Sequence, residues 1–352
     1  MDLPSKSDLS HIPIFFIIGR TRSGTTLLRT LFDAHPNVTI PVECPFIGGY
    51  YLSYGKRKHW NAQRFERFVD YLMKTRKFST LNISREQLLS HLLPLAGTVS
   101  YATICKTIIS LYPSVFPKEE IQILGDKNPV YSLYFRYLPL IFPEARYIHL
   151  VRDYRDQILS TKAVDFEFHN TAIIAYKWKK SVRILERAKK KNPELFHTVK
   201  YEDLTADPVI QVQNICRFLN IPYQSSMLSF HEKKEGLEKE YSKYSIETHH
   251  KSLIQPINTR KVDLWKNQLS EREINMADQV AGKWSEKMGY DRNYNGFNLI
   301  IWFRSLPSVF LTESIHLFVL IVHYLPFTFR NRILNRGPLL VGFLKRKNKQ
   351  TK

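Results

Sequence analysis

The sequence predicts an α/β fold of three layers, in which helices flank a central parallel sheet, followed by a hydrophobic helical tail. Short apolar runs alternate with segments of helical apolar spacing, a pattern typical of strands and helices in a parallel sheet. The first run leads into a glycine-bounded loop, and the composition changes at Phe297. We therefore divide the 352 residues into a domain at 1–295 and a tail at 296–352.

The chain is strongly basic, with a net charge of +20 and a pI near 9.7. This charge predicts attraction to an anion, such as a nucleotide, an anionic lipid, a nucleic acid or a sulfated polymer, without choosing among them. Cys44, Cys105 and Cys216 are widely spaced and form no zinc or disulfide pattern, which favours a reducing compartment. Because no apolar signal core follows the N-terminus, we expect a cytoplasmic protein.

A phosphate-binding loop is predicted near the N-terminus, where a buried strand at 14–18 leads into Gly19, Gly24 and a helix. Backbone N–H groups of such a loop, together with the N-terminus of the helix, bind anions. The spacing matches the nucleotide loop G-x4-G-K-[ST], except that Thr25 replaces the lysine. A triphosphate needs that lysine, so we expect a donor whose transferable group carries less charge.

Charged side chains follow two further predicted strands. Glu43 ends an extended segment at 38–42, and Lys127 follows a strand at 121–125 and precedes a helix at 130–142. Since ligands bind at the carboxyl ends of parallel strands, both side chains are expected to face the same crevice as the loop. A solvated or ion-paired Glu43 is the alternative interpretation.

A second anion motif follows the strand RYIHLV at 146–151. Arg152 comes directly after this strand, and Ser160 lies about two turns into the helix that begins there. Arginine recognises a phosphate through two parallel hydrogen bonds, and the serine hydroxyl adds a donor. His149 lies within the strand, so we assign it to packing.

The later segments continue the alternation of strands and helices. A polar stretch at 236–261 is too long for a structureless connection in a compact domain, so we interpret it as an irregular lid over a nucleotide. The other expected elements are a basic helix at 170–191, a strand at 196–201, and helices at 208–219, 262–266 and 271–288.

Together, these motifs resemble the PAPS-dependent sulfotransferases, where PAPS is 3′-phosphoadenosine-5′-phosphosulfate. The segment RTRSGTTLLRTLFDAHPNV is similar to the 5′-phosphosulfate loop, especially of the tyrosylprotein sulfotransferase branch and its bacterial relatives. YIHLVRDYRDQILS is similar to the 3′-phosphate motif. VECPF and GDKNP resemble the segments that carry the branch's catalytic glutamate and lysine, and the resemblance runs from residue 14 to 290.

The resemblance implies a role for each matched residue. Glu43 would take the proton of an acceptor hydroxyl. Arg22 and Lys127 would stabilise the leaving group, which is PAP, the desulfated product of PAPS. No metal is implied. The residues implied to bind PAPS are Arg20, Thr21, Arg22, Ser23, Gly24, Thr25 and Thr26 of the loop, with Arg152, Ser160, Tyr201 and Lys251 elsewhere.

The acceptor remains open at this stage. The tyrosylprotein enzymes place a serine at the sulfuryl group in a region that corresponds here to ETHHKSLIQP, at 247–256, where His249 and Lys251 are the candidate replacements. A lipid, a carbohydrate and a protein tyrosine all stay candidates, and we expect no nucleic-acid partner. The alternatives are an ATP-dependent phosphotransferase with a variant loop, and a non-catalytic protein that binds membranes or polyanions.

The tail has a composition of its own. From residue 297 onward it holds nine Lys or Arg and one Glu, a net charge of +8. Its uncharged window, 314–329, is shorter than the roughly 20 residues that span a bilayer. We expect either an interfacial anchor on the inner face of an anionic membrane, or a helical hairpin packed on the domain or between the subunits of a homodimer.

Overall fold

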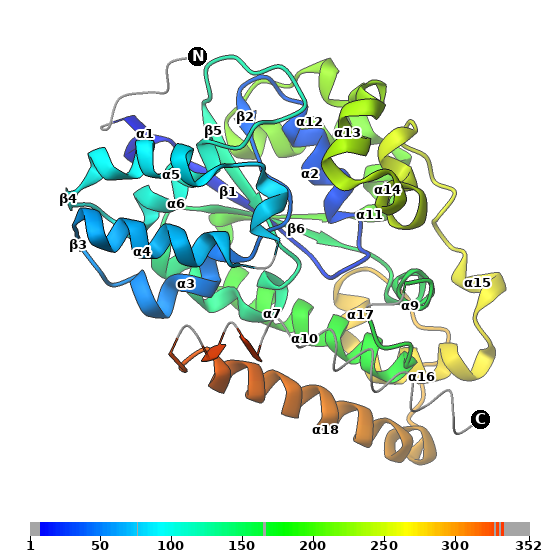
Figure 1. Cartoon of the computed structure of the whole chain (residues 1–352). Coiled ribbons are helices and arrows are strands. Elements are labelled where there is room, and N and C mark those ends of the chain that lie inside the picture. Colours follow the sequence, from blue (N-terminus) through cyan, green and yellow to red (C-terminus); the bar gives the residue numbers. More distant parts are fainter. Residues whose placement is uncertain (1–7, 76, 165–166, 327–328, 331, 334–352) are drawn as a thin grey trace.

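The computed structural model describes residues 8–75, 77–164, 167–326, 329–330 and 332–333. Its centre is a five-stranded, wholly parallel sheet with the strand order β2-β5-β1-β6-β7 (Figure 1). These strands are β1 (Ile14–Ile18), β2 (Val38–Thr39), β5 (Ile123–Lys127), β6 (Arg146–Val151) and β7 (Phe196–Lys200). The predicted α/β fold with a central parallel sheet is therefore confirmed. A short antiparallel pair, β3 (His59–Trp60) and β4 (Gly97–Thr98), was not predicted.

The central strand β1 is buried on both faces, because successive side chains of a strand point to opposite sides. Phe15 packs edge-on against Phe32 on one face, whereas Phe16 stacks on Tyr147 on the other. The Phe15 face is covered by α2 (Thr25–Asp33), α11 (Tyr201–Ala206), α12 (Pro208–Leu219), α13 (Lys234–Tyr241) and α14 (Lys243–His249). The Phe16 face is covered by α3 (Phe46–Tyr54), α4 (Ala62–Met73), α5 (Arg85–Leu92), α6 (Tyr101–Ser110), α7 (Tyr131–Tyr134) and α8 (Leu138–Ile141).

A third buried cluster lies beyond the carboxyl end of β6. Trp178 is its centre, and the Trp178 indole donates to the carbonyl of Arg152 at 2.9 Å. This contact fixes the backbone at the predicted phosphate-binding arginine. The cluster is built from α9 (Tyr154–Lys162), α10 (Thr171–Lys189), α15 (Trp265–Gln268), α16 (Glu271–Ala281) and α17 (Lys283–Lys287).

Several predicted boundaries were wrong. Lys127 is the last residue of β5 rather than the residue after the strand, and the helix predicted at 130–142 is broken into α7, a 3₁₀ turn and α8. Tyr201 begins α11 instead of ending a strand. The stretch predicted as an irregular lid is mainly helical, because α13, α14 and a 3₁₀ helix at Lys251–Ile254 occupy it.

A buried ion pair ties this helical segment to the helix that follows the phosphate loop. Arg29 of α2 donates to Glu240 of α13 at 2.8 Å and to the Tyr112 hydroxyl at 2.8 Å. Arg29 also lies 3.2 Å from Asp33 one turn later. Removing one partner from a buried pair leaves an uncompensated charge, so α13 is held firmly against α2.

The described part of the tail contains a long helix, α18 (Leu299–Val322), which lies along the lower edge of the molecule beside α10 and α16 (Figure 1). It begins well before the uncharged window predicted at 314–329 and contains Pro307 and Glu313. By length and composition alone, α18 is suited to cross a membrane, which the shorter predicted window was not.

Candidate functional site

The phosphate loop connects β1 to α2 through two residues with positive φ. Gly24 has φ 95° and Arg22 has φ 70°, a conformation that is uncommon for a residue with a side chain. Ser23 closes the turn by donating its N–H to the carbonyl of Arg20 at 3.1 Å. Tyr201 packs on the loop so closely that a Cβ on Gly24 would lie 2.5 Å from its ring. The loop backbone is thus held in one conformation at the N-terminus of α2.

Replacing Gly24 by alanine is expected to disrupt this loop. The added Cβ is strained at φ 95° and collides with Tyr201, so we expect a loss of about 2 kcal/mol or more of stability. Thermal unfolding measures this loss. Gly49→Ala in α3 is the matched control, because its added Cβ would meet no atom within 4 Å. Equal melting temperatures for the two variants would contradict the strained geometry.

A carboxylate and two ammonium groups meet beside the loop. Lys127 Nζ lies 3.3 Å from Glu43 Oε2 and 3.4 Å from the Thr26 hydroxyl, and Lys77 Nζ lies 2.7 Å from Glu43 Oε1. Lys127 is buried, whereas the side chains of Glu43 and Lys77 are partly exposed. The two predicted residues, Glu43 and Lys127, are therefore in direct contact, and Lys77 is an addition that the sequence did not indicate.

The charge state of Glu43 follows from these contacts. Burial raises the pKa of the Glu43 carboxyl, but the ammonium groups of Lys127 and Lys77 outweigh burial and lower it to about 2. Burial lowers the pKa of Lys127, and the carboxylate of Glu43 opposes this. Glu43 is consequently ionised at neutral pH and able to accept a proton.

Replacing Lys77 by methionine tests this arrangement. Because Lys77 helps to lower the pKa of Glu43, its loss should raise that pKa, and the acidic limb of the kcat/KM profile should move up by about one pH unit. The measurement is the pH dependence of the rate of turnover. Lys56→Met, at an exposed lysine, should leave the limb unchanged. An unmoved limb in the Lys77 variant would mean that Glu43 does not set it.

A second group of cations gathers on the other side of the loop. The Arg22 guanidinium donates to the Ser160 hydroxyl at 3.1 Å and to the carbonyl of His249 at 3.1 Å. Arg152 donates to the carbonyl of Arg22 at 3.1 Å and to the carbonyl of Lys261 at 2.5 Å. Its guanidinium also lies over the Tyr201 ring, 4.5 Å from the ring centre. Arg22, Arg152, Ser160 and Tyr201 thus form one site.

Like charges are concentrated at this site. Burial lowers the pKa of Arg22, and the positive charge of Arg152 lowers it further. Burial likewise lowers the pKa of Lys261, and Arg22, Arg152 and Lys251 add to that effect. Cations held together in this way bind an anion favourably, because an anion relieves their mutual repulsion.

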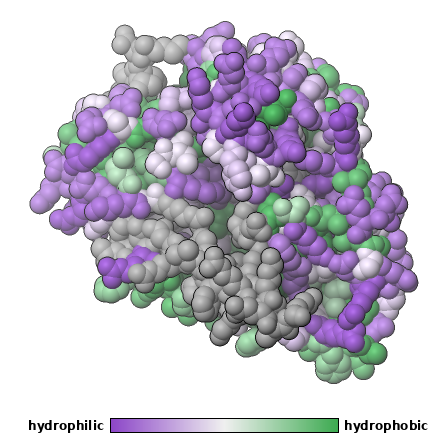
Figure 2. Space-filling model, turned by 45° about the vertical axis from the view of Figure 1, so that its right-hand side comes forward, coloured by the Kyte–Doolittle hydropathy of each residue, from purple (hydrophilic) through white to green (hydrophobic). Residues whose placement is uncertain are grey.

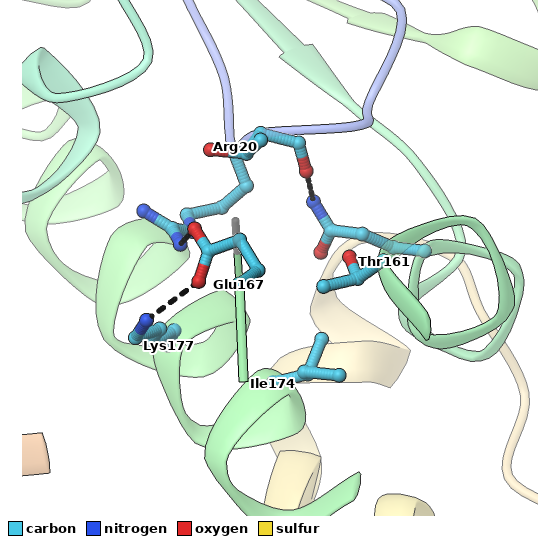
Figure 3. Close-up of a pocket in the computed structure, with 7 residues that line it drawn as sticks. Arg20, Thr161, Glu167, Ile174 and Lys177 are labelled. Carbon is cyan, nitrogen blue, oxygen red and sulfur yellow. Dashed lines mark hydrogen bonds and ion pairs between the residues drawn. The ribbon is translucent and has the colours of Figure 1, made fainter. Parts of the chain in front are cut away.

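Arg20 points away from both groups. Its guanidinium lies 3.5 Å from the Ser132 hydroxyl and 3.9 Å from Glu167, which also pairs with Lys177 at 2.9 Å. Figure 3 shows Arg20, Glu167 and Lys177 around a small pocket below the loop, where Gln157 donates to the carbonyl of Thr21 at 2.7 Å. The start of the loop is therefore anchored to Glu167 through Arg20 and to α9 through the carbonyl of Thr21.

Comparison with known proteins shows the family of this chain. A model of the sulfotransferase family matches residues 13–225, more than half of the chain. This chain belongs to the sulfotransferase family. The match contains the phosphate loop, Glu43, Lys127, Arg152 and Ser160. The sulfotransferase resemblance seen in the sequence is confirmed, and the phosphotransferase and non-catalytic alternatives are set aside.

Relatives agree with this assignment. The sulfotransferase is 27% identical over 289 residues to protein-tyrosine sulfotransferase A of Caenorhabditis elegans, covering 80% of this chain and 68% of the relative. It is 26% identical over 294 residues to protein-tyrosine sulfotransferase 1 of Danio rerio, covering 81% and 74%. The fold is similar to that of the sulfotransferase domain of the Synechococcus PCC 7002 olefin synthase, which superposes with a TM-score of 0.52 at 24% identity, covering 79% of this chain and 95% of that domain.

The sulfotransferase site also contains His250, which sequence reasoning did not assign to it, beside the predicted residues His249 and Lys251. His250 lies close to Lys127 and Arg22; burial first, and then these cations, lower its pKa to about 3, so it is neutral. His249 meets Arg22 through its backbone carbonyl, and Lys251 is exposed. Within the described ranges, no cluster of three or more His, Cys, Asp and Glu side chains is arranged to hold a metal ion.

Proposed function

We propose that this sulfotransferase moves a sulfuryl group from PAPS to an acceptor hydroxyl, with Glu43 as the general base. The observation that carries the proposal is the contact between Glu43 and Lys127 beside the phosphate loop, at 3.3 Å. A base and a cation at one strand edge suit a reaction in which a proton leaves one reactant while negative charge grows on the other.

In this mechanism the acceptor hydroxyl attacks sulfur in line with the bond to the 5′-phosphate. The acceptor's O–H proton passes to Glu43 as the new O–S bond forms and the S–O bond to PAP breaks. Lys127 and the N–H groups at the start of α2 stabilise the negative charge that appears on the phosphate. The hydroxyl competes with Lys77 for Oε1 of Glu43, which Lys77 contacts at 2.7 Å.

The donor's two phosphate ends are assigned to different parts of the site. We assign the 3′-phosphate to Arg152 and Ser160, and the 5′-phosphosulfate to the loop from Arg22 to Thr26. Arg22 lies between the two ends, because its guanidinium contacts Ser160 while its backbone forms part of the loop. This arrangement would favour a bisphosphorylated nucleotide over ADP.

Binding and turnover experiments test the proposal together. Calorimetry should give tighter binding of PAP than of ADP, with and without magnesium, since the proposed contacts come from side chains and backbone. Incubating membrane and soluble extracts with ³⁵S-labelled PAPS should then yield a labelled acceptor. Preference for ADP with magnesium, or the absence of any labelled product, would argue against it.

The acceptor class is proposed only as a hydroxyl. The relatives named above are protein-tyrosine sulfotransferases, so a tyrosine-containing peptide is one candidate, beside lipid and carbohydrate hydroxyls. Mass spectrometry of the labelled product distinguishes them, because sulfated tyrosine remains in the peptide fraction whereas a sulfated lipid partitions into organic solvent.

A further inference from the structure

The polarity of α18 is inverted with respect to that of an ordinary surface helix. Its buried residues are mostly polar, namely Ser305, Ser308 and Thr312, with Val322 near the end. Large apolar side chains cover the opposite side, with Phe310 75% exposed. Figure 2 shows hydrophobic residues along the lower edge of the molecule, where Figure 1 places α18. The exposed apolar residues of this surface are Leu299, Ile300, Trp302, Phe303, Leu306, Phe310, Leu311, Ile315, Leu317, Phe318 and Ile321.

Polar contacts hold the inner side of α18 to the domain. Glu313 lies 2.7 Å from Lys180 and accepts the Tyr176 hydroxyl at 2.6 Å, both from α10. The Ser308 hydroxyl donates to Asn170 at 3.2 Å, and the His316 ring stacks on Tyr134 of α7 at 5.0 Å. The helix is therefore fixed lengthwise on the domain with its apolar side turned outward.

We propose that α18 lies flat in the headgroup region of an anionic phospholipid bilayer and docks the sulfotransferase on it. A contiguous exposed apolar surface of this kind marks an interaction site. The tail that contains α18 has a net charge of +8, and basic residues beside an apolar helix strengthen its binding to anionic lipid.

Charge and polar contacts favour a flat position on an anionic bilayer over two alternatives, a second copy of the chain and a membrane-spanning orientation. A second copy of the chain carries the same net charge of +20, and the repulsion between two such chains opposes that pairing. A spanning orientation would detach α18 from α10 and carry the Glu313 carboxylate towards the bilayer centre, which is costly. Lying flat keeps the contacts of Glu313 and buries the apolar side.

Vesicle flotation with the full chain tests the proposal. We expect the protein to float with vesicles of phosphatidylcholine mixed with phosphatidylglycerol, and less with phosphatidylcholine alone. Phe310→Glu with Phe318→Glu should lower the partition coefficient at least about tenfold. Leu140→Glu with Ile210→Glu is the matched control, because it places the same charge on exposed apolar residues of α8 and α12; it should float like the unmodified chain.

Any of four results would overturn the proposal. The first is an unmodified chain that does not float, and the second is an equal loss of flotation in both double variants. The third is a lipid-free dimer, seen by sedimentation equilibrium, that only the α18 variant dissociates. Orientation is read from the added fluorescence of Phe310→Trp, at the middle of α18: lipids brominated near the headgroup should quench it more than lipids brominated near the chain end, and the reverse order would indicate a spanning helix.

Discussion

Glu43→Gln is expected to lower kcat for sulfuryl transfer by about 10²- to 10⁴-fold, the range that general-base catalysis contributes. Glutamine keeps the shape of the side chain, and its one amide oxygen can accept a hydrogen bond from Lys77 or from Lys127, but it cannot take the acceptor's proton at neutral pH. PAP affinity should change little, because the proposed nucleotide contacts come from other residues. Initial rates with labelled PAPS, and calorimetry with PAP, measure the two quantities.

The control for this variant removes a carboxylate elsewhere. Glu66→Gln lies on the exposed side of α4 and should retain full turnover. Both variants should melt at temperatures close to that of the unmodified chain. Turnover by Glu43→Gln within a few-fold of the unmodified rate would eliminate Glu43 as the base.

Truncating Arg152 should have the largest effect on nucleotide binding. The buried guanidinium lies over Tyr201 at 4.5 Å, and removing one partner of a buried charge contact costs about 2–5 kcal/mol. We therefore expect Arg152→Ala to weaken PAP binding by at least about 30-fold. AMP, which lacks the 3′-phosphate, should lose much less affinity, and calorimetry with both nucleotides gives the ratio.

The comparison of PAP with AMP distinguishes two roles of Arg152, namely binding of the 3′-phosphate and support of the loop. Arg152 also donates to the carbonyls of Arg22 and Lys261, so its loss alters the loop as well. An equal loss of affinity for both nucleotides would assign Arg152 to loop support only. Arg152→Lys keeps the charge without the planar fork and should bind PAP with intermediate affinity. Arg217→Ala, at an exposed arginine of α12, is the control.

The sequence was sufficient for the parts of the site that follow strands. The apolar run at 14–18 is buried on both faces, so it could be recognised by composition alone. Arg152 directly follows a strand whose bounds, 146–151, were predicted correctly, and Ser160 lies on the helix that was predicted after it. Local pattern and spacing decide such positions, and the structure brings these residues together with Arg22.

Residues contributed by loops and distant helices could not be predicted in the same way. Lys77 reaches Glu43 from 34 positions later in the chain, and nothing near Lys77 resembles an anion or catalytic motif. Lys261 and His250 reach the site only because α13 and α14 fold over it. We interpreted the polar composition of 236–261 as an irregular lid. Tertiary contacts, such as that of Arg29 with Glu240, stabilise helices in this stretch instead.

The tail illustrates a different limit. The uncharged window predicted at 314–329 left out Glu313, yet α18 includes this residue. Lys180 pairs with the Glu313 carboxylate and Tyr176 donates to it, so its charge is compensated inside the protein. A one-dimensional pattern cannot reveal that the polar residues of a helix face the protein. The inverted polarity of α18 became visible only when its neighbours were known.

The two arginines of the nucleotide site form hydrogen bonds that a donor would have to displace. Arg22 donates to the carbonyl of His249 and Arg152 to that of Lys261, so the segment 249–261 is tied to the guanidinium groups that we assign to phosphates. Upstream, Arg29 and Glu240 keep α13 in place. Donor entry therefore replaces these carbonyl partners of the two arginines by phosphate, and PAP release reverses the replacement. We expect the barrier to both steps to lie in the segment 249–261 rather than in α13 and α14 as a whole.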